Sequence, residues 1–149
     1  ASSAMHEKSL KLLLQSFGVL CCLAIVAFVM PASWFHWCHQ QLGMGDFPEQ
    51  PVAEYLARAT SGLVTFMGIL ALVIATDVRG YSAVIRLLAI SLVVLEIINL
   101  VFGFSAGMPA WWIWSDALGA IAFAAAVIYL QNKINTAPST VQTEQGAGE

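Results

Sequence analysis

Five polar or charged residues lie inside the long apolar stretches of this chain, and they are the side chains there that could bind a ligand or transfer a proton. They are Glu54, Arg58, Glu96, Asn99 and Asp116. An ionisable side chain in hydrocarbon costs about 2.5–3.5 kcal/mol on insertion scales, so such a residue usually faces the protein interior and has a partner. The five residues are therefore the first candidates for a ligand, ion or proton site.

Helix geometry predicts that three of these charged residues share one depth. Arg58 lies seven residues after Pro51, and Asp116 lies seven after Pro109. At 1.5 Å per residue, both would sit about 10 Å below the membrane surface at which their helices begin. Glu96, on the helix that ends at the same surface, would lie about 12 Å below it. We therefore expect the three side chains at a common level.

The charges at this level predict one cluster, with Arg58 between Asp116, Glu54 and Glu96. Glu54 precedes Arg58 by four residues, which is a favourable spacing for an ion pair on a helix, and Asn99 is one turn from Glu96. The arginine fork can hold two carboxylates. Because three acids oppose one Arg, we expect one acid, Glu96, to be protonated or paired with a histidine or water.

Three further residues are candidates for the same site. His36 and His39 are three apart and would share a helix face, while Trp112 precedes Asp116 by four residues. No third ligand stands at a diagnostic spacing from the histidines, so no metal site is assigned. The cluster has two interpretations, which stay open: a buried ion-pair network that fixes helix register, or a site for a ligand, quinone, ion or proton.

Composition indicates a membrane protein. The chain has 149 residues, of which 59% are hydrophobic and only 10% charged, and its mean hydropathy is +0.78. Soluble domains carry about 25% charged residues. Six scattered Lys and Arg residues form no basic stripe, which argues against a nucleic-acid partner. Neither a C-x-x-C pair nor a recognisable catalytic motif is present, so no catalytic residue is assigned and we expect no catalytic activity of its own.

The apolar stretches predict an all-α fold, a bundle of four transmembrane helices at about 10–30, 51–75, 82–104 and 109–130. Together they form one domain, 10–132, between a polar segment at 1–9, in which Met5 is the expected native start, and a disordered polar tail at 133–149. The connection 31–50 is rich in Trp and His, which is typical of a membrane interface. Small residues suited to close helix packing are Gly62, Gly119, Ala120 and Ala124.

Charge placement predicts that both termini are cytoplasmic. The connections 31–50 and 105–108 contain no Lys or Arg, so the positive-inside rule places them outside. The basic residues that flank the remaining helix ends are Lys8, Lys11, Arg79, Arg86 and Lys133.

Over residues 8–132 the chain resembles the DoxX-like and BphX-like small bacterial membrane proteins. The resemblance is carried by four spans with internal termini, by Leu42-Gly43 in a Pro- and Trp-rich outer loop, and by the stretch from Pro51 to Ser61, which includes E-Y-L-A-R-A-T-S. It implies a location in the bacterial cytoplasmic (inner) membrane. Some DoxX-like members are linked to quinone-coupled sulfur oxidation, but neither family offers an agreed catalytic motif to carry over.

Three functions fit these observations. The first is an accessory or scaffold subunit, whose partners would be the lipid bilayer and either other membrane subunits or further copies of itself. The second is a redox subunit that binds a quinone or another small molecule, with quinone as its possible cofactor. The third is a proton-coupled carrier. We favour it less, because four helices make a small transporter unless the protein dimerises.

Overall fold

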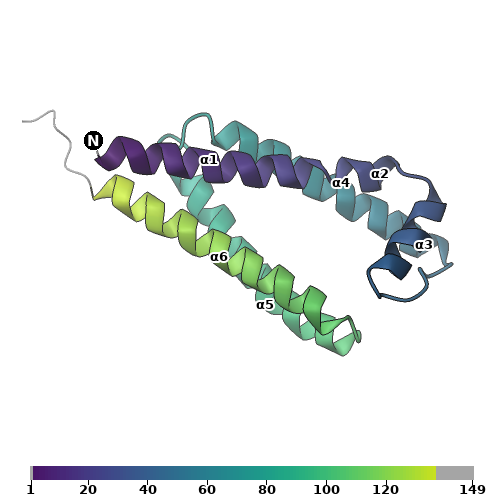
Figure 1. The fold of residues 1–149 in the computed structure, drawn as a ribbon. Helices are drawn as coiled ribbons and strands as arrows, with labels where there is room; N and C mark the ends of the chain where they lie inside the picture. The colour runs from purple at the N-terminus through teal and green to yellow at the C-terminus, as the bar shows by residue number, and fades with distance from the viewer. Residues whose placement is uncertain (1, 137–149) are drawn as a thin grey trace, which may run out of the picture.

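Helices are the regular secondary structure of the part described by the computed structural model, residues 2–136, and short loops and turns connect them (Figure 1). The predicted all-α class is confirmed, and no strand occurs between residues 2 and 136. The helices are α1 (Ser2–Cys22), α2 (Ile25–Val29), α3 (Ala32–Gln41), α4 (Pro51–Ile74), α5 (Ser82–Ser105) and α6 (Ala110–Asn135).

Four helical segments are long and apolar enough to cross a membrane, as the hydropathy pattern predicted. They are Ser3–Val29, Pro51–Ile74, Ser82–Ser105 and Ala110–Asn135, the first of which comprises α1 and α2. The protein is therefore consistent with a multi-pass membrane protein. Pro51 occupies the first turn of α4, where the missing backbone N–H costs nothing.

The helices extend beyond the predicted spans at both ends of the described chain. α1 begins at Ser2, within the segment predicted as polar, and α6 continues to Asn135, three residues into the predicted tail. The extension of α6 has a physical reason, because Ile134 is only 5% exposed and belongs to the core. Lys133 adds a contact, with its ammonium 5.6 Å from the ring centre of Tyr129. The rest of the predicted tail, from residue 137 on, lies outside the described residues.

The four spans form two helical hairpins that meet at one end. α1 and α2 pack against α4, α5 packs against α6, and α1 also contacts α6. Figure 1 shows that the hairpins converge where α1 begins and α6 ends, and diverge toward α3 and the α5–α6 connection. We call these the closed end and the open end. The predicted bundle is therefore closed at one end only.

The hydrophobic core lies at the closed end. Its buried members come from both hairpins, so they are what joins them. They are Leu10, Leu14, Ile74, Ala75, Val78, Ile85, Ala89, Ala124, Val127 and Ile134.

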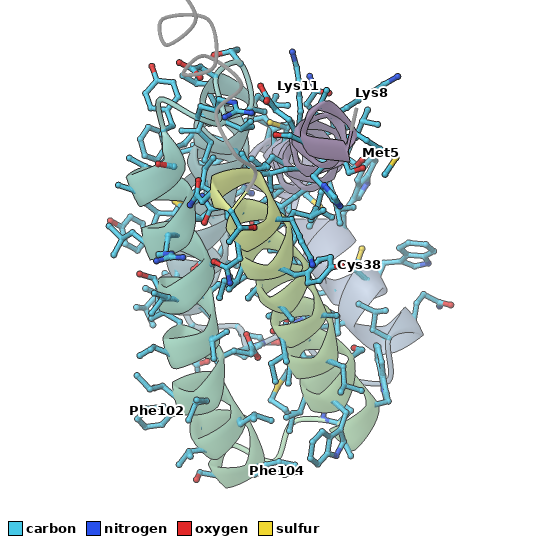
Figure 2. The ribbon with its side chains drawn as sticks, turned by 90° about the vertical axis from the view of Figure 1, so that its left-hand side faces the viewer. Met5, Lys8, Lys11, Cys38, Phe102 and Phe104 are labelled. Carbon is cyan, nitrogen blue, oxygen red and sulfur yellow. The ribbon has the colours of Figure 1, made fainter. Side chains whose placement is uncertain are left out.

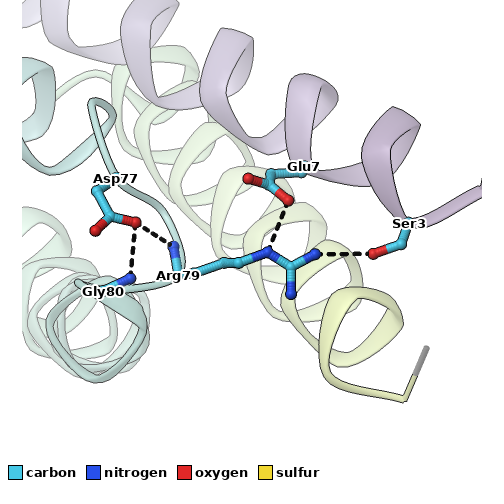
Figure 3. A network of polar contacts seen from close by, with 5 residues as sticks. All are labelled: Ser3, Glu7, Asp77, Arg79 and Gly80. Carbon is cyan, nitrogen blue, oxygen red and sulfur yellow. Dashed lines mark hydrogen bonds and ion pairs between the residues drawn. The ribbon is translucent and has the colours of Figure 1, made fainter. Parts of the chain in front are cut away.

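A polar network ties the start of α1 to the turn between α4 and α5 (Figure 3). The Asp77 carboxylate accepts hydrogen bonds from the backbone N–H groups of Arg79, at 3.2 Å, and Gly80, at 2.9 Å. Arg79 in turn donates from Nε to Glu7 Oε2, at 2.8 Å, and from Nη2 to Ser3 Oγ, at 3.0 Å. The aspartate thus shapes the turn, and the arginine attaches the turn to α1.

The helices α1 and α4 approach each other closely at Gly18 and Gly68. A Cβ atom on Gly68 would lie 2.7 Å from the Gly18 carbonyl oxygen and 2.8 Å from the Cys22 nitrogen, both backbone atoms. Glycine lets helix backbones approach this closely in a membrane. Of the small residues predicted to pack closely, Gly62 would place a Cβ atom 3.1 Å from the Phe28 ring and Ala124 is buried in the core, whereas a Cβ atom on Gly119 would meet nothing within 4 Å. The packing role predicted for Gly119 is therefore wrong.

We expect Gly68→Ala to destabilise the protein, because the new methyl group would collide with backbone that cannot move aside. Overpacking of this kind costs about 1–3 kcal/mol, which should lower the midpoint of thermal unfolding in detergent. Gly119→Ala is the matched control and should not lower it, since its methyl enters open space. Equal midpoints for the two variants would contradict the close approach.

Candidate functional site

The structure divides the predicted cluster into two groups on different hairpins. Arg58 and Glu54 lie together on α4, whereas Glu96 and Asn99 on α5 lie beside Asp116 on α6. α4 and α5 belong to the hairpins that diverge toward the open end (Figure 1). A common depth did not bring the groups together, because helices at equal depth can be laterally separated.

Arg58 has three hydrogen bonds and an aromatic contact within its own hairpin. Its Nε and Nη2 donate to Glu54 Oε1, at 2.9 and 2.7 Å, and its Nη1 donates to the Phe28 carbonyl oxygen, at 2.8 Å. The guanidinium carbon lies 5.3 Å from the ring centre of Phe35. Because Phe28 is in the last turn of α2, its carbonyl has no intrahelical partner. Arg58 satisfies that carbonyl and joins α2, α3 and α4.

His36 and His39 share one face of α3, as their spacing predicted, and that face packs on Phe47. The ring centres lie 5.7 Å and 4.9 Å from that of Phe47, which is only 8% exposed, and Phe35 stacks on the same ring at 5.2 Å. The histidines thus help to hold the connection 42–50 against α3, and their ring contacts are with this aromatic group. Between residues 2 and 136, no three His, Cys, Asp or Glu side chains are grouped as a metal ion would need.

Glu96 is the buried acid of the second group. Its residue is 6% exposed, although most of α5 is open to the surroundings, and the Asn99 side chain lies beside its carboxyl group. Asp116 is near enough for the two carboxylates to repel each other. Among residues 2–136 the ion pairs are Arg58–Glu54 and Arg79–Glu7, so neither acid of this group has a cationic partner.

Two hollows meet at these carboxyl groups. The first, which we call the inner hollow, measures about 440 Å³ and lies between α1, α5 and α6. The second, the outer hollow, measures about 350 Å³ and lies between the open-end halves of α5 and α6, where Asn99 and Trp112 line it. Glu96 and Asp116 line both. The two acids therefore form the polar boundary between two hollows.

Apolar side chains make most of the wall of the inner hollow. Phe17 of α1 and Phe123 of α6 stack with their ring centres 4.3 Å apart and border it. Leu13 and Leu20 of α1 add to the wall. Gly119 has no side chain, so the space beside it remains part of the hollow. The arrangement suits a small molecule that is largely apolar and has one polar or charged group.

Sequence reasoning missed the contribution of α1 to this site. The sequence does not distinguish Phe17 from the other apolar residues of its spanning helix. Phe17 meets Phe123 because α1 packs against α6. One local signal was available, because Gly119 follows Asp116 by three residues and so shares its helix face. A small residue beside a charged one on a spanning helix is consistent with a hollow as well as with packing.

No protein-family model matches the chain, and searches of curated proteins and of solved structures also give no match. The resemblance to the DoxX-like and BphX-like proteins therefore stays a prediction.

We expect Arg58→Met to destabilise the protein by about 1–3 kcal/mol, the cost of leaving hydrogen-bonding groups without partners. The midpoint of thermal unfolding in detergent measures the loss. Arg86→Met is the control, since Arg86 makes one exposed hydrogen bond, 2.9 Å from its Nη2 to Asn132 Oδ1, and should change the midpoint little.

Adding Asp116→Asn to Arg58→Met should change stability by the sum of the two single effects, because the residues lie on different hairpins. Recovery of stability in the double variant would show instead that Arg58 and Asp116 are paired.

Proposed function

We propose that this chain is a multi-pass membrane protein that binds a small amphipathic molecule in the inner hollow. Glu96 and Asp116 would make the polar contacts, and the leucine and phenylalanine side chains of α1 and α6 would cover its apolar part. The observation that carries the proposal is a buried glutamate, 6% exposed, that lines a hollow of about 440 Å³ and has no cationic partner among residues 2–136. Pockets with apolar walls and few convergent polar groups are typical of small-molecule sites.

The contrast with Arg58 supports this assignment. Arg58 and Glu54 neutralise each other and satisfy a carbonyl, so their contacts account for them as a structural network. Glu96 and Asp116 are both acids, so they form no ion pair that would hold helices together. Their placement is better explained by an occupant than by helix register.

The other functions predicted from sequence fit less well. A quinone presents two carbonyl oxygens, which need hydrogen-bond donors, whereas a carboxyl group donates only while it holds a proton and then offers a single O–H. Ser115, a possible donor in the inner hollow, already gives its hydroxyl proton to the Trp112 carbonyl at 2.9 Å. An accessory subunit remains compatible with a ligand, but a scaffold alone gives no reason for an unpaired buried acid.

We propose that both termini lie in the cytoplasm, which the charge distribution supports, and that the membrane is the bacterial cytoplasmic membrane, as the resemblance to the DoxX-like and BphX-like proteins implies. Figure 2 looks onto the closed end, where the side chains of Lys8 and Lys11 point away from the other helices. With Arg79, Arg86 and Lys133, five of the six basic residues flank the helix ends that meet there. The positive-inside rule places such an end in the cytoplasm.

Reporter fusions should confirm this orientation. Alkaline phosphatase, which is active only outside the cytoplasm, should be inactive when fused after Glu149 and active when fused at Gly107 in the α5–α6 connection. A fluorescent protein that matures only in the cytoplasm should give the opposite pattern at the same two positions. The reverse result for both reporters would contradict the proposed orientation.

The binding proposal predicts that filling the inner hollow abolishes binding. Gly119→Leu would place a side chain in open space at the hollow, without striking the helix backbone. Two aromatic probes of similar shape, cationic tetraphenylphosphonium and neutral triphenylphosphine oxide, are titrated calorimetrically into the purified protein. At least one should bind saturably to the wild-type protein, and binding should weaken at least about tenfold in Gly119→Leu, or about 1.4 kcal/mol.

Leu118→Phe is the matched control, because Leu118 is the neighbouring residue of α6 and is 62% exposed. It should leave binding of either probe unchanged. The proposal fails if neither probe binds to the wild-type protein, or if Gly119→Leu binds as the wild-type protein does.

A further inference from the structure

We infer that the inner hollow takes up a lipophilic organic cation in exchange for a proton held by Glu96 and Asp116. The inference rests on the proposed function and names the chemical class of its ligand and the ion that competes with it.

The charges around the two acids give the first argument. From α1, the residues that face the hollow include Leu13, Ser16 and Phe17, and its α1 wall contains no ionisable side chain. From α5 the polar neighbour of Glu96 is the neutral Asn99, and from α6 it is the second acid, Asp116. Arg58, the arginine predicted at the same depth, is bound to Glu54 on the other hairpin. Two ionised carboxylates at this place would lack any balancing charge, so the pair must hold either a proton or a cation.

The walls of the hollow decide which kind of cation fits. Ca²⁺ takes six to eight oxygen ligands and Mg²⁺ demands a near-octahedral oxygen shell, whereas this hollow offers two carboxyl groups and mostly apolar wall. An organic cation that carries its charge within a hydrocarbon or aromatic body needs no such shell. The stacked Phe17 and Phe123 rings, 4.3 Å apart, add aromatic surface that attracts such a cation.

Exchange keeps the charge of the site constant. With one proton shared between them, the two carboxyl groups carry one negative charge. When a monovalent cation enters and the proton leaves, two carboxylates and one cation again sum to one negative charge. Neither state places extra charge in the membrane. Because protons compete with the cation, its affinity should rise with pH, by about tenfold per pH unit while one proton is released for each cation bound.

The experiment compares the same two probes by calorimetry on the purified full-length protein between about pH 6 and about pH 8. We expect tetraphenylphosphonium to bind at least about tenfold more tightly than triphenylphosphine oxide, and its affinity to rise with pH. Repeating the titration in buffers of different ionisation enthalpy should show release of about one proton per cation bound.

Variants separate the role of the acids from general effects. Glu96→Gln should lose the preference for the cation and the release of the proton, whereas Glu96→Asp, which keeps a carboxyl group, should retain part of both. Asp46→Asn removes one acid outside the site, where it pairs with Gln40 at 3.1 Å, and should behave as the wild-type protein does.

The outcomes distinguish the two proposals. Equal binding of the probes without proton release would overturn the exchange inference and leave the binding proposal standing. Absence of binding of either probe to the wild-type protein would overturn both. Should Glu96→Gln fail to fold, the wild-type protein still tests the exchange inference, because a cation affinity that does not change with pH and binding without proton release would overturn it.

Discussion

The hairpins are joined at one end only, and the rest of the structure depends on that constraint. The core that joins them, from Leu10 to Ile134, lies where the four spans converge, and Arg79 attaches the α4–α5 turn to α1 at the same end. Beyond this point the hairpins diverge, so the open-end half of α6 meets α5 but is not enclosed by α4 (Figure 1). Space that a fully packed bundle would fill with side chains is left as two hollows beside Glu96.

The two groups of polar residues in the candidate spanning helices differ in how the free-energy cost of their burial is offset. Arg58 and Glu54 cancel each other's charge within one turn of α4, and Arg58 Nη1 donates to the Phe28 carbonyl oxygen. A carbonyl without a partner in lipid costs several kcal/mol, so this contact has a structural value of its own. Among residues 2–136, the polar side chains beside the Glu96 carboxyl group are a neutral amide and a second acid, so no cation of the chain offsets its burial. Under the proposed function, a bound ligand or a proton offsets that cost.

Local features of the fold were predictable from the sequence, whereas lateral packing was not. Apolar length, together with Pro51 and Pro109, indicated the four spans, and the spacing of Glu54 and Arg58 predicted an ion pair that forms at 2.7 Å. The expected meeting of Arg58 with Asp116 required knowing which helices are neighbours. That depends on contacts between distant residues, such as Gly18 with Gly68, and hydropathy does not report them. Arg58's other partner is a backbone carbonyl, which no residue pattern reveals.

The separation of core and site along the helices has a consequence for how the protein tolerates change. The buried core residues lie at the closed end, whereas Glu96, Asn99 and Asp116 lie toward the open end and take no part in it. Among residues 2–136, removing a carboxylate there breaks no ion pair and leaves no cation without a partner, so the usual cost of disrupting a buried pair does not arise. By contrast, Arg58 and Gly68 hold helices together, so we expect substitutions at either residue to lower the stability of the protein. The site can therefore vary in chemistry while the arrangement that positions it stays intact.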